Sequence, residues 1–452
     1  MRIHRLSTAA LSLLFLVLSA ALGAEDAATS YPITWDENAT AESLGLDPLV
    51  LPDDLYPVYP WDQVCRPQGF NFKKDPTKGF VRMAESAFSV PAFVEESDLA
   101  AAKQAGFHHI LLAMGTGEID LLDAKEEEVD AFVKERVAGT KDDPEVMGYY
   151  ITDEPGAKEY PALAMFVAAI KKYAPGKLAY INLFPSYAST IGADVDSQMQ
   201  TYTFTEYLER YVQEVKPQFI SYDNYMIEYS EDMTNKAMAD VYWRDILEIR
   251  RIAQKYNLPW WNIVSSLAIR QKSSPPNMAR MALQAYTSLA AGANGLGWFL
   301  FFSPGEPYYG PIDHTDEKTL TFQMQRDVNL QTVTLGKILN NFRSTSVWFS
   351  KPTDTLPANP GDLLRGVNLS YQEEIKDAAG APSVMVGEFR AKEGTQKAVM
   401  LVNLSFSRSI IASLDLKEAG TIRVVNPITG TAHAPRQREW ILPGHGLLFL
   451  ID

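Results

Sequence analysis

Two acidic side chains stand next to each other at the end of the apolar run 148–155. The run is Gly-Tyr-Tyr-Ile-Thr-Asp-Glu-Pro, so Asp153 and Glu154 come directly before Pro155. Proline has no N–H to donate to a neighbouring strand. The pattern therefore predicts a strand that ends at Glu154. Side chains alternate along a strand, so we expect Tyr150 and Glu154 on one face and Asp153 on the other. Such carboxyl groups suit general acid–base chemistry, whereas the alternative is an acidic start to the next helix.

A second carboxyl group ends a later apolar run, 219–225, whose sequence is Phe-Ile-Ser-Tyr-Asp-Asn-Tyr. If this run forms a strand, the side chain of Asp223 would point toward the same group of strand ends as that of Glu154. The alternative is a buried aspartate that bonds to the backbone or to a neighbouring tyrosine. Two acids on predicted loops, Glu228 and Glu306, are further candidates.

These residues must be positioned by the elements between residues 85 and 345, where short apolar strands alternate with amphipathic helices. The predicted strands are 107–114, 148–154, 177–184, 218–225, 259–265 and 295–302, and the predicted helices are 97–105, 126–137, 160–173, 204–215, 237–256, 277–291 and 320–341. This alternation indicates parallel strands with crossover helices. A (β/α)8 TIM-type barrel is favoured over an open sheet, because polar and aromatic residues follow nearly every strand and no Gly-rich phosphate turn follows the first. Only a weak strand, 118–122, fits before residue 148, so the first half is expected to be irregular.

The segments that flank the barrel have different compositions. Residues 1–24 join Arg2 and Arg5 to a short apolar run with a small-residue end, which predicts a signal peptide and a secreted or periplasmic protein. A membrane anchor is the alternative, but the run is shorter than a span needs. Residues 25–84, rich in Pro, Asp and Tyr, are expected to form an extension packed on the barrel. Strands at 383–390, 397–403, 421–426 and 447–451 predict a small all-β sandwich domain over 346–452.

Composition excludes several classes of partner and cofactor. The net charge of −15, without a long basic run, argues against nucleic acid. No His-x-His, His-Glu-x-x-His, Gly-x-Ser-x-Gly or dinucleotide-binding pattern occurs, so neither a metal nor a cofactor is expected. Cys65 is the only cysteine, which rules out an intramolecular disulfide. After the signal peptide, no segment predicts a membrane span.

The end of the predicted fourth strand resembles that of the clan A glycoside hydrolases. Their fourth strand typically ends in Asn-Glu-Pro or a close variant, and here Asp153-Glu154-Pro155 is followed by the strand Leu178-Ala-Tyr-Ile-Asn-Leu-Phe-Pro185. The resemblance covers about residues 85–345. It implies a catalytic barrel with Glu154 as general acid/base and Asp153 at the family's asparagine position. An appended β-domain also recurs in that group.

The sequence departs from that family at its predicted seventh strand. Clan A enzymes carry a second glutamate there, the nucleophile, whereas residues 260–266 are Trp-Trp-Asn-Ile-Val-Ser-Ser and contain no acid. We therefore expect Asp223 to be the second carboxyl group. A strand-four acid with a Tyr-Asp pair on strand six is similar to the layout of family 18 chitinases, and carboxylate pairs on these two strands also occur in α-galactosidases.

The resemblance implies a glycoside hydrolase whose partner is a carbohydrate, and the predicted signal peptide indicates that it is secreted. The expected catalytic residues are Glu154 and, in place of the missing strand-seven acid, Asp223, with retention or inversion left open. Aromatic rings fit the apolar faces of sugars and desolvate a carboxyl group, although any single ring can equally be core packing. The expected substrate-binding residues are Tyr150, Asp153, Asn182, Tyr187, Tyr222, Tyr225, Trp260, Trp261, Trp298 and Glu306.

Two other functions fit the sequence. The missing acid on strand seven favours a non-catalytic glycan-binding protein on a decayed glycosidase barrel. A lyase or isomerase acting on sugar acids would need a basic cluster for the substrate carboxylate. The arginines that could form one lie on predicted helices or loops, where a solvated face is the simpler interpretation: Arg244, Arg250, Arg251, Arg270 and Arg280.

Overall fold

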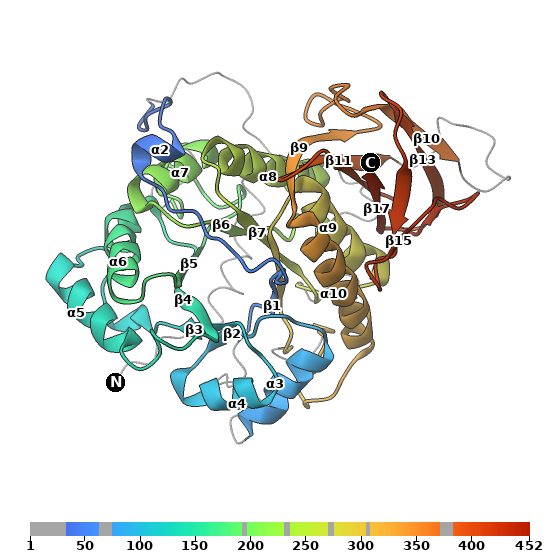
Figure 1. The fold of residues 1–452 in the computed structure, drawn as a ribbon. Coiled ribbons are helices and arrows are strands. Elements are labelled where there is room, and N and C mark those ends of the chain that lie inside the picture. Colours follow the sequence, from blue (N-terminus) through green and yellow to red (C-terminus); the bar gives the residue numbers. More distant parts are fainter. Residues whose placement is uncertain are drawn as a thin grey trace. The chain divides into compact units, whose positions relative to one another are not determined.

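The fold was obtained as a computed structural model (Figure 1). The residues that the structure describes are 33–62, 75–191, 197–229, 236–269, 275–303, 308–370 and 383–452. The chain forms two compact units. Unit 1 comprises Met1–Leu49, Leu111–Asp223 and Arg251–Pro259, and unit 2 comprises Val50–Ile110, Asn224–Arg250 and Trp260–Asp452.

Unit 1 is built on parallel strands. β3, β4 and β5 are neighbours in that order, β4 and β5 are parallel, and Leu183, just after β5, forms a parallel bridge with Tyr222 of β6. The strands are β3 (Ile110–Ala113), β4 (Val146–Asp153), β5 (Leu178–Asn182) and β6 (Ile220–Asp223). The helices are α2 (Ala41–Leu44), η4 (Thr116–Glu118), α5 (Glu126–Val137), η5 (Ala157–Glu159), α6 (Tyr160–Tyr173), α7 (Phe204–Arg210) and the π-helix η6 (Tyr211–Val215).

Two helices cover this sheet. α5 begins with three consecutive glutamates and carries Lys134 and Arg136 in its last turn, charges that complement the helix dipole. Its residues Val129, Val133 and Val137 recur at helical spacing and are buried. α5 packs on α6, which contacts β5 (Figure 1). Because β4, β5 and β6 run parallel, their carboxyl ends lie at one edge.

Unit 2 contains the parallel strands β1 (Val58–Pro60), β8 (Gly295–Phe299) and β7 (Trp260–Ser265), with β8 between the other two. Its further elements are α3 (Pro76–Glu85), β2 (Ala92–Val94), η3 (Glu96–Asp98), α4 (Leu99–Gln104), η7 (Met226–Tyr229), α9 (Met278–Ala291) and α10 (Leu320–Leu339). Helix α8 (Lys236–Lys255) begins in unit 2 and ends in unit 1.

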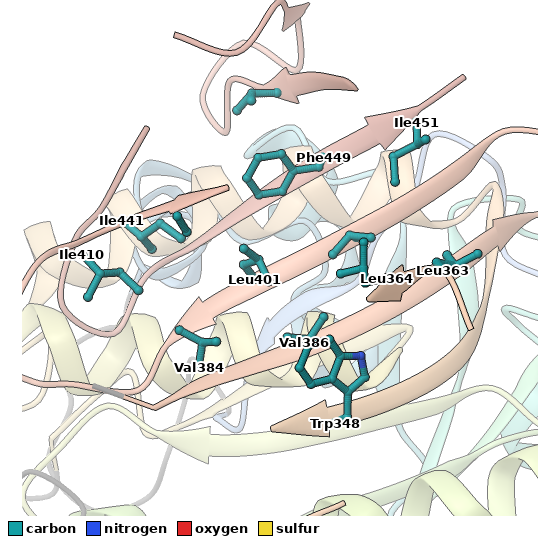
Figure 2. Packing of buried hydrophobic residues seen from close by; sticks show 13 residues of the cluster. Trp348, Leu363, Leu364, Val384, Val386, Leu401, Ile410, Ile441, Phe449 and Ile451 are labelled. Carbon is teal, nitrogen blue, oxygen red and sulfur yellow. The ribbon is translucent and has the colours of Figure 1, made fainter. Parts of the chain in front are cut away.

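The C-terminal part of unit 2 is antiparallel and all-β. One sheet has the order β10-β13-β16 and the other β15-β14-β17-β12-β11-β9. These strands are β9 (Phe342–Phe349), β10 (Leu364–Ser370), β11 (Val384–Ala391), β12 (Lys397–Asn403), β13 (Ile410–Leu416), β14 (Ile422–Val425), β15 (Ala432–His433), β16 (Trp440–Ile441) and β17 (Gly446–Ile451). Figure 2 shows the core between the sheets, to which Trp348, Leu401 and Phe449 contribute. The larger sheet also contacts α9, which packs on β7 as well.

Most predicted elements are present. The helices at 126–137 and 160–173 and the strand at 397–403 match their predicted bounds. The weak strand at 118–122 is wrong, because that stretch begins with the end of the 3-10 helix η4 and has no strand geometry. β1 and β2 were not expected, since three buried residues are too few to show a period. The boundaries at 84/85 and 345/346 stay predictions.

The predicted signal peptide and Cys65 lie outside the described residues. Across the part of the chain that the structure describes, no helix has both the length and the apolar character needed to cross a bilayer.

Candidate active site

The end of β4 departs from regular strand geometry at two places. Its register against β5 shifts between Tyr150 and Thr152, which makes Ile151 an extra residue in the pairing. Glu154 then adopts a φ of 48°, in the left-handed region, while its N–H donates to the carbonyl of Asn182 over 2.9 Å. Both features interrupt the alternation of side chains along the strand.

As a result, the carboxyl groups of Asp153 and Glu154 both lie beside Asn182 and Asp223. Asn182 Nδ2 donates to Asp153 Oδ1 over 3.1 Å and to Asp223 Oδ1 over 3.0 Å. The carboxyl group of Glu154 is hydrogen-bonded to that of Asp223. The prediction that Asp153 and Glu154 point to opposite faces is therefore wrong. The expectation that Asp223 points to the same place as Glu154 is confirmed.

Asn182 is held by a chain of hydrogen bonds that begins on β5 and passes through β6. Ser221 Oγ donates to Asn182 Oδ1 over 2.9 Å, and the hydroxyls of Ser221 and Tyr180 are 2.9 Å apart. Because the single hydrogen of Ser221 is used by Asn182, Tyr180 must be the donor in its bond with Ser221. All three residues are buried, so water does not compete for these bonds.

The environment of the cluster changes the proton affinity of its acids. Burial raises the pKa of Asp153 to about 6, although the hydrogen bond from Asn182 acts in the opposite direction. The pKa of Glu154 is raised well above its ordinary value, first by burial, then by the negative charges of Asp223 and Asp153, and by the hydrogen bond with Asp223. Asp153 and Glu154 keep part of their surface exposed, whereas Asp223 is only 3% exposed. The raised pKa lets Glu154 keep its proton to a higher pH than an ordinary glutamate, which suits it to donate that proton.

Two tyrosines adjoin the cluster from β4 and α7. Burial raises the pKa of Tyr150, and the charges of Asp153 and Glu154 raise it further. The hydroxyl of Tyr207 donates to the carbonyl of Pro155 over 2.7 Å and accepts from the N–H of Phe184 over 3.4 Å. Burial raises the pKa of Tyr207, and the charge of Glu154 adds to the rise.

Sequence reasoning missed three members of this site, Tyr180, Ser221 and Tyr207. The first two could have been found, because each lies two positions before a predicted site residue and so shares its strand face. Tyr207 carried no such signal, since it lies on a helix far along the chain from Glu154.

The remaining predicted residues of unit 1 lie on its strand ends. Tyr222 of β6 is fully buried, whereas Tyr187, just after β5, is half-buried. Asn182 was expected to bind substrate, but both of its amide hydrogens and its oxygen are used within the protein.

In unit 2, the predicted aromatic residues occupy positions typical of core packing. Trp260, Trp261 and Trp298 are buried, and Trp298 Nε1 donates to Asn329 Oδ1 over 2.7 Å. Trp261 packs on Tyr59 with ring centroids 5.4 Å apart. Tyr225, also buried, packs on Phe299 with ring centroids 5.1 Å apart.

Glu306 lies outside the described residues, as does the side chain of Glu228. Within the described ranges, no group of three or more His, Cys, Asp or Glu side chains is arranged to hold a metal ion.

Comparison with known proteins gives structural likenesses only. No family model matches the chain, and no curated protein matches it in sequence. A glycoside hydrolase family 5 protein from Bacteroides vulgatus matches with a TM-score of 0.51 and 11% identity, over 88% of this chain and 89% of that one. A structure described as a glycoside hydrolase has a TM-score of 0.53 and 10% identity, over 88% and 92%. Gan42B, a GH42 β-galactosidase from G. stearothermophilus, has a TM-score of 0.57 and 7% identity, over 88% and 98%.

At these identities the likeness concerns the fold. The fold class expected from the sequence, a (β/α)8 TIM-type barrel followed by a small all-β sandwich, is confirmed, and it is the fold of glycoside hydrolases.

Proposed function

We propose that this protein is a glycoside hydrolase that cleaves O-glycosidic bonds of an oligo- or polysaccharide, with Glu154 as its proton donor. The observation that carries the proposal is the hydrogen bond between the carboxyl groups of Glu154 and Asp223, at the carboxyl ends of β4 and β6. Chemistry in barrels of this type takes place at those strand ends. The resemblance of Asp153-Glu154-Pro155 to the fourth strand of clan A supports the same role.

Proton donation is the step that this arrangement favours. Departure of the leaving sugar requires a proton on the glycosidic oxygen, and the raised pKa of Glu154 keeps that proton available to a higher pH than in an ordinary glutamate. As the bond breaks, positive charge develops on the other sugar ring. The negative charges of Asp153 and Asp223 would stabilise that charge.

Asp223 is proposed as the second catalytic carboxyl group, because its side chain interacts directly with that of Glu154. Carboxyl groups are about 5–5.5 Å apart in retaining glycosidases and about 6.5–9.5 Å apart in inverting ones. In the structure the carboxyl groups of Glu154 and Asp223 are instead hydrogen-bonded to each other. To act as nucleophile or as base for water, Asp223 would exchange this bond for contact with the sugar or the water.

The closed pair also favours a second candidate, a non-catalytic glycan-binding protein. Carboxyl groups that stay hydrogen-bonded to each other leave no room for an anomeric carbon or a water molecule between them. In that case sugars would bind at the strand ends without being cleaved.

Glu154→Gln tests the proposal. General acid catalysis contributes about 10²–10⁴-fold, so hydrolysis of glycosides with poor leaving groups should fall by that factor. Aryl glycosides with acidic leaving groups need little protonation and should lose much less. Rates are measured on a matched series of leaving groups, with glycan affinity measured in parallel. Glu128→Gln, the same change at an exposed position of α5, is the control.

Equal losses across the leaving groups would contradict the role of Glu154. No hydrolysis by the wild-type protein, with glycan binding retained, would favour the binding protein. For an active enzyme, NMR of the first-formed anomer distinguishes retention from inversion.

We also propose that the protein is exported, as the basic start and apolar run of residues 1–24 indicate. Mass spectrometry of the mature N-terminus after expression in a secreting host tests this: cleavage near residue 24 is expected, and an uncleaved, cell-retained chain would contradict it.

A further inference from the structure

Three carboxyl groups lie in contact with one another or with one shared amide, and they cannot all be ionised at low cost. Asp153 and Asp223 each accept a hydrogen bond from Asn182, and Glu154 shares a hydrogen bond with Asp223. Neighbouring carboxylates repel each other, so such a cluster retains a proton to a higher pH than separate carboxyl groups would. Which of the three groups holds that proton decides whether the proposed acid is ready to act.

The amide of Asn182 has only one orientation that fits its neighbours. An amide nitrogen carries two hydrogens, and here each one goes to a different aspartate. The amide oxygen accepts from Ser221, which in turn accepts from Tyr180. Reversing the amide would place its oxygen against two carboxylate oxygens, with no hydrogen between them. The two aspartates therefore set the direction in which Asn182 donates, and Ser221 and Tyr180 complete the hydrogen bonds of its oxygen.

A hydrogen bond donated to a carboxylate stabilises its ionised form. Asn182 supplies such bonds to Asp153 and Asp223 but none to Glu154 in the described contacts. Glu154 instead bonds to Asp223, a contact in which one partner must contribute a hydrogen. Other ionisable groups that face the cluster are Tyr150 from β4 and Tyr207 from α7, both of which stay neutral.

We infer that Asn182 decides which carboxyl group of the site carries the proton: by donating one hydrogen to each of Asp153 and Asp223, it keeps both ionised and leaves the proton on Glu154. Asn182 is thus a positioning residue that acts through these acids. The inference rests on the proposed function for its consequence in catalysis, but the location of the proton can be measured without turnover.

The effect of removing Asn182 follows from the charges. In Asn182→Leu, Asp153 and Asp223 each lose the hydrogen bond from Asn182 and take up protons at higher pH than before. Glu154 then has less negative charge beside it and releases its own proton at lower pH. Because a general acid works only when protonated, the fall of kcat/KM on the alkaline side of the pH profile should move to lower pH. On that side, the loss of hydrogen bonds to charged groups predicts a decrease of about tenfold or more.

The experiment combines two measurements on the full-length protein. Carbon NMR of protein labelled at the glutamate side-chain carboxyl follows the titration of Glu154, which is assigned from the signal missing in Glu154→Gln. The pH profile of kcat/KM is measured on the same samples. Ser221→Ala is the second variant, in case Asn182→Leu does not fold. It removes the hydroxyl that donates to the amide oxygen, so Asn182 is held less firmly against the aspartates, and a smaller shift in the same direction is expected.

Thr140→Val is the matched control, because it removes a buried hydrogen bond of 2.9 Å, to Tyr149 on β4, from a residue with no described contact to the carboxyl groups. Its Glu154 titration should match that of the wild type even if its stability falls. An unchanged Glu154 titration in both Asn182→Leu and Ser221→Ala would overturn the inference, whether or not the protein is active. A shifted titration in a protein that hydrolyses no glycoside would support the inference and reject the proposed function.

Discussion

The hydroxyl of Tyr207 donates a hydrogen bond of 2.7 Å to the carbonyl of Pro155, the residue that follows Glu154. This bond links α7 to the strand end that carries the proposed acid. The same hydroxyl accepts from the N–H of Phe184, just beyond β5. Tyr207 thus connects the ends of two adjacent strands at the point where Glu154 leaves regular strand geometry.

Tyr207→Phe should lower kcat more than it changes KM. The substitution leaves the carbonyl of Pro155 without its donor and loosens the backbone beside Glu154, which should cost about 1–3 kcal/mol of stability and about tenfold in kcat. Steady-state kinetics and denaturant unfolding measure the two effects. Tyr160→Phe is the control, since Tyr160 is equally buried and donates to the carbonyl of Tyr207 over 3.1 Å. An equal fall in kcat in both variants would mean that the effect is general destabilisation.

Asp153→Asn should make the stability of the protein less dependent on pH. The pKa of Asp153 is about 6 in the folded chain, against about 4 for an unperturbed aspartate. Between these values the folded chain keeps a proton that the unfolded chain has released. Wild-type stability therefore falls as pH rises from about 4 to about 6 and stays lower above that range.

The asparagine does not ionise and still offers an oxygen to Asn182. The melting temperature of Asp153→Asn should therefore exceed that of the wild type at pH 7.5 and show no such gain at pH 4. The gain in the free energy of unfolding should differ by about 1–3 kcal/mol between the two pH values. Thermal unfolding from pH 4 to 8 measures this. Asp142→Asn, at an exposed position, is the control for the change in charge. A constant difference at every pH would contradict the prediction.

Glu154→Gly should separate stability from function. Glu154 has a φ of 48°, a conformation that costs a residue with a Cβ atom about 1–2 kcal/mol and glycine little. The glycine variant should be at least as stable as the wild type while its activity falls by about 10²-fold or more. Lys216→Gly, with a φ of 54° at an exposed position away from the site, should gain stability without loss of activity. A clear loss of stability in Glu154→Gly would show that the carboxyl group contributes to folding.

Gly387→Ala should destabilise the contact between the β-sandwich and α9. A Cβ at this position of β11 would lie 2.1 Å from the carbonyl oxygen of Ala290, so the sheet or the helix must move. Overpacking of this kind typically costs about 1–3 kcal/mol. At Gly366 on β10 a Cβ would meet nothing within 4 Å, and Gly366→Ala should therefore be tolerated. Calorimetry on the two variants makes the comparison, and equal melting temperatures would contradict it.

Local sequence pattern alone identified most of the helices and strands and the two acids proposed for the site. The helix at 160–173 and the strand before Pro155 follow from spacing, apolar residues and proline, all of which act within a few residues. For the same reason Glu154 and Asp223 could be proposed from the sequence, since each follows an apolar run that ends at the mouth of a predicted barrel.

Tertiary structure decided how these groups meet. The extra residue in β4 and the left-handed Glu154 are set by pairing with β5, so regular alternation predicted the wrong face for Asp153. Asn182 was expected to bind substrate, but its partners come from β4 and β6, and the sequence does not show which strands are neighbours in space. Tyr207 shows the same limit, because its contact with Pro155 depends on how α7 packs. The sequence thus determined where acids lie along the chain, and packing decided which carboxyl groups touch and which one retains the proton.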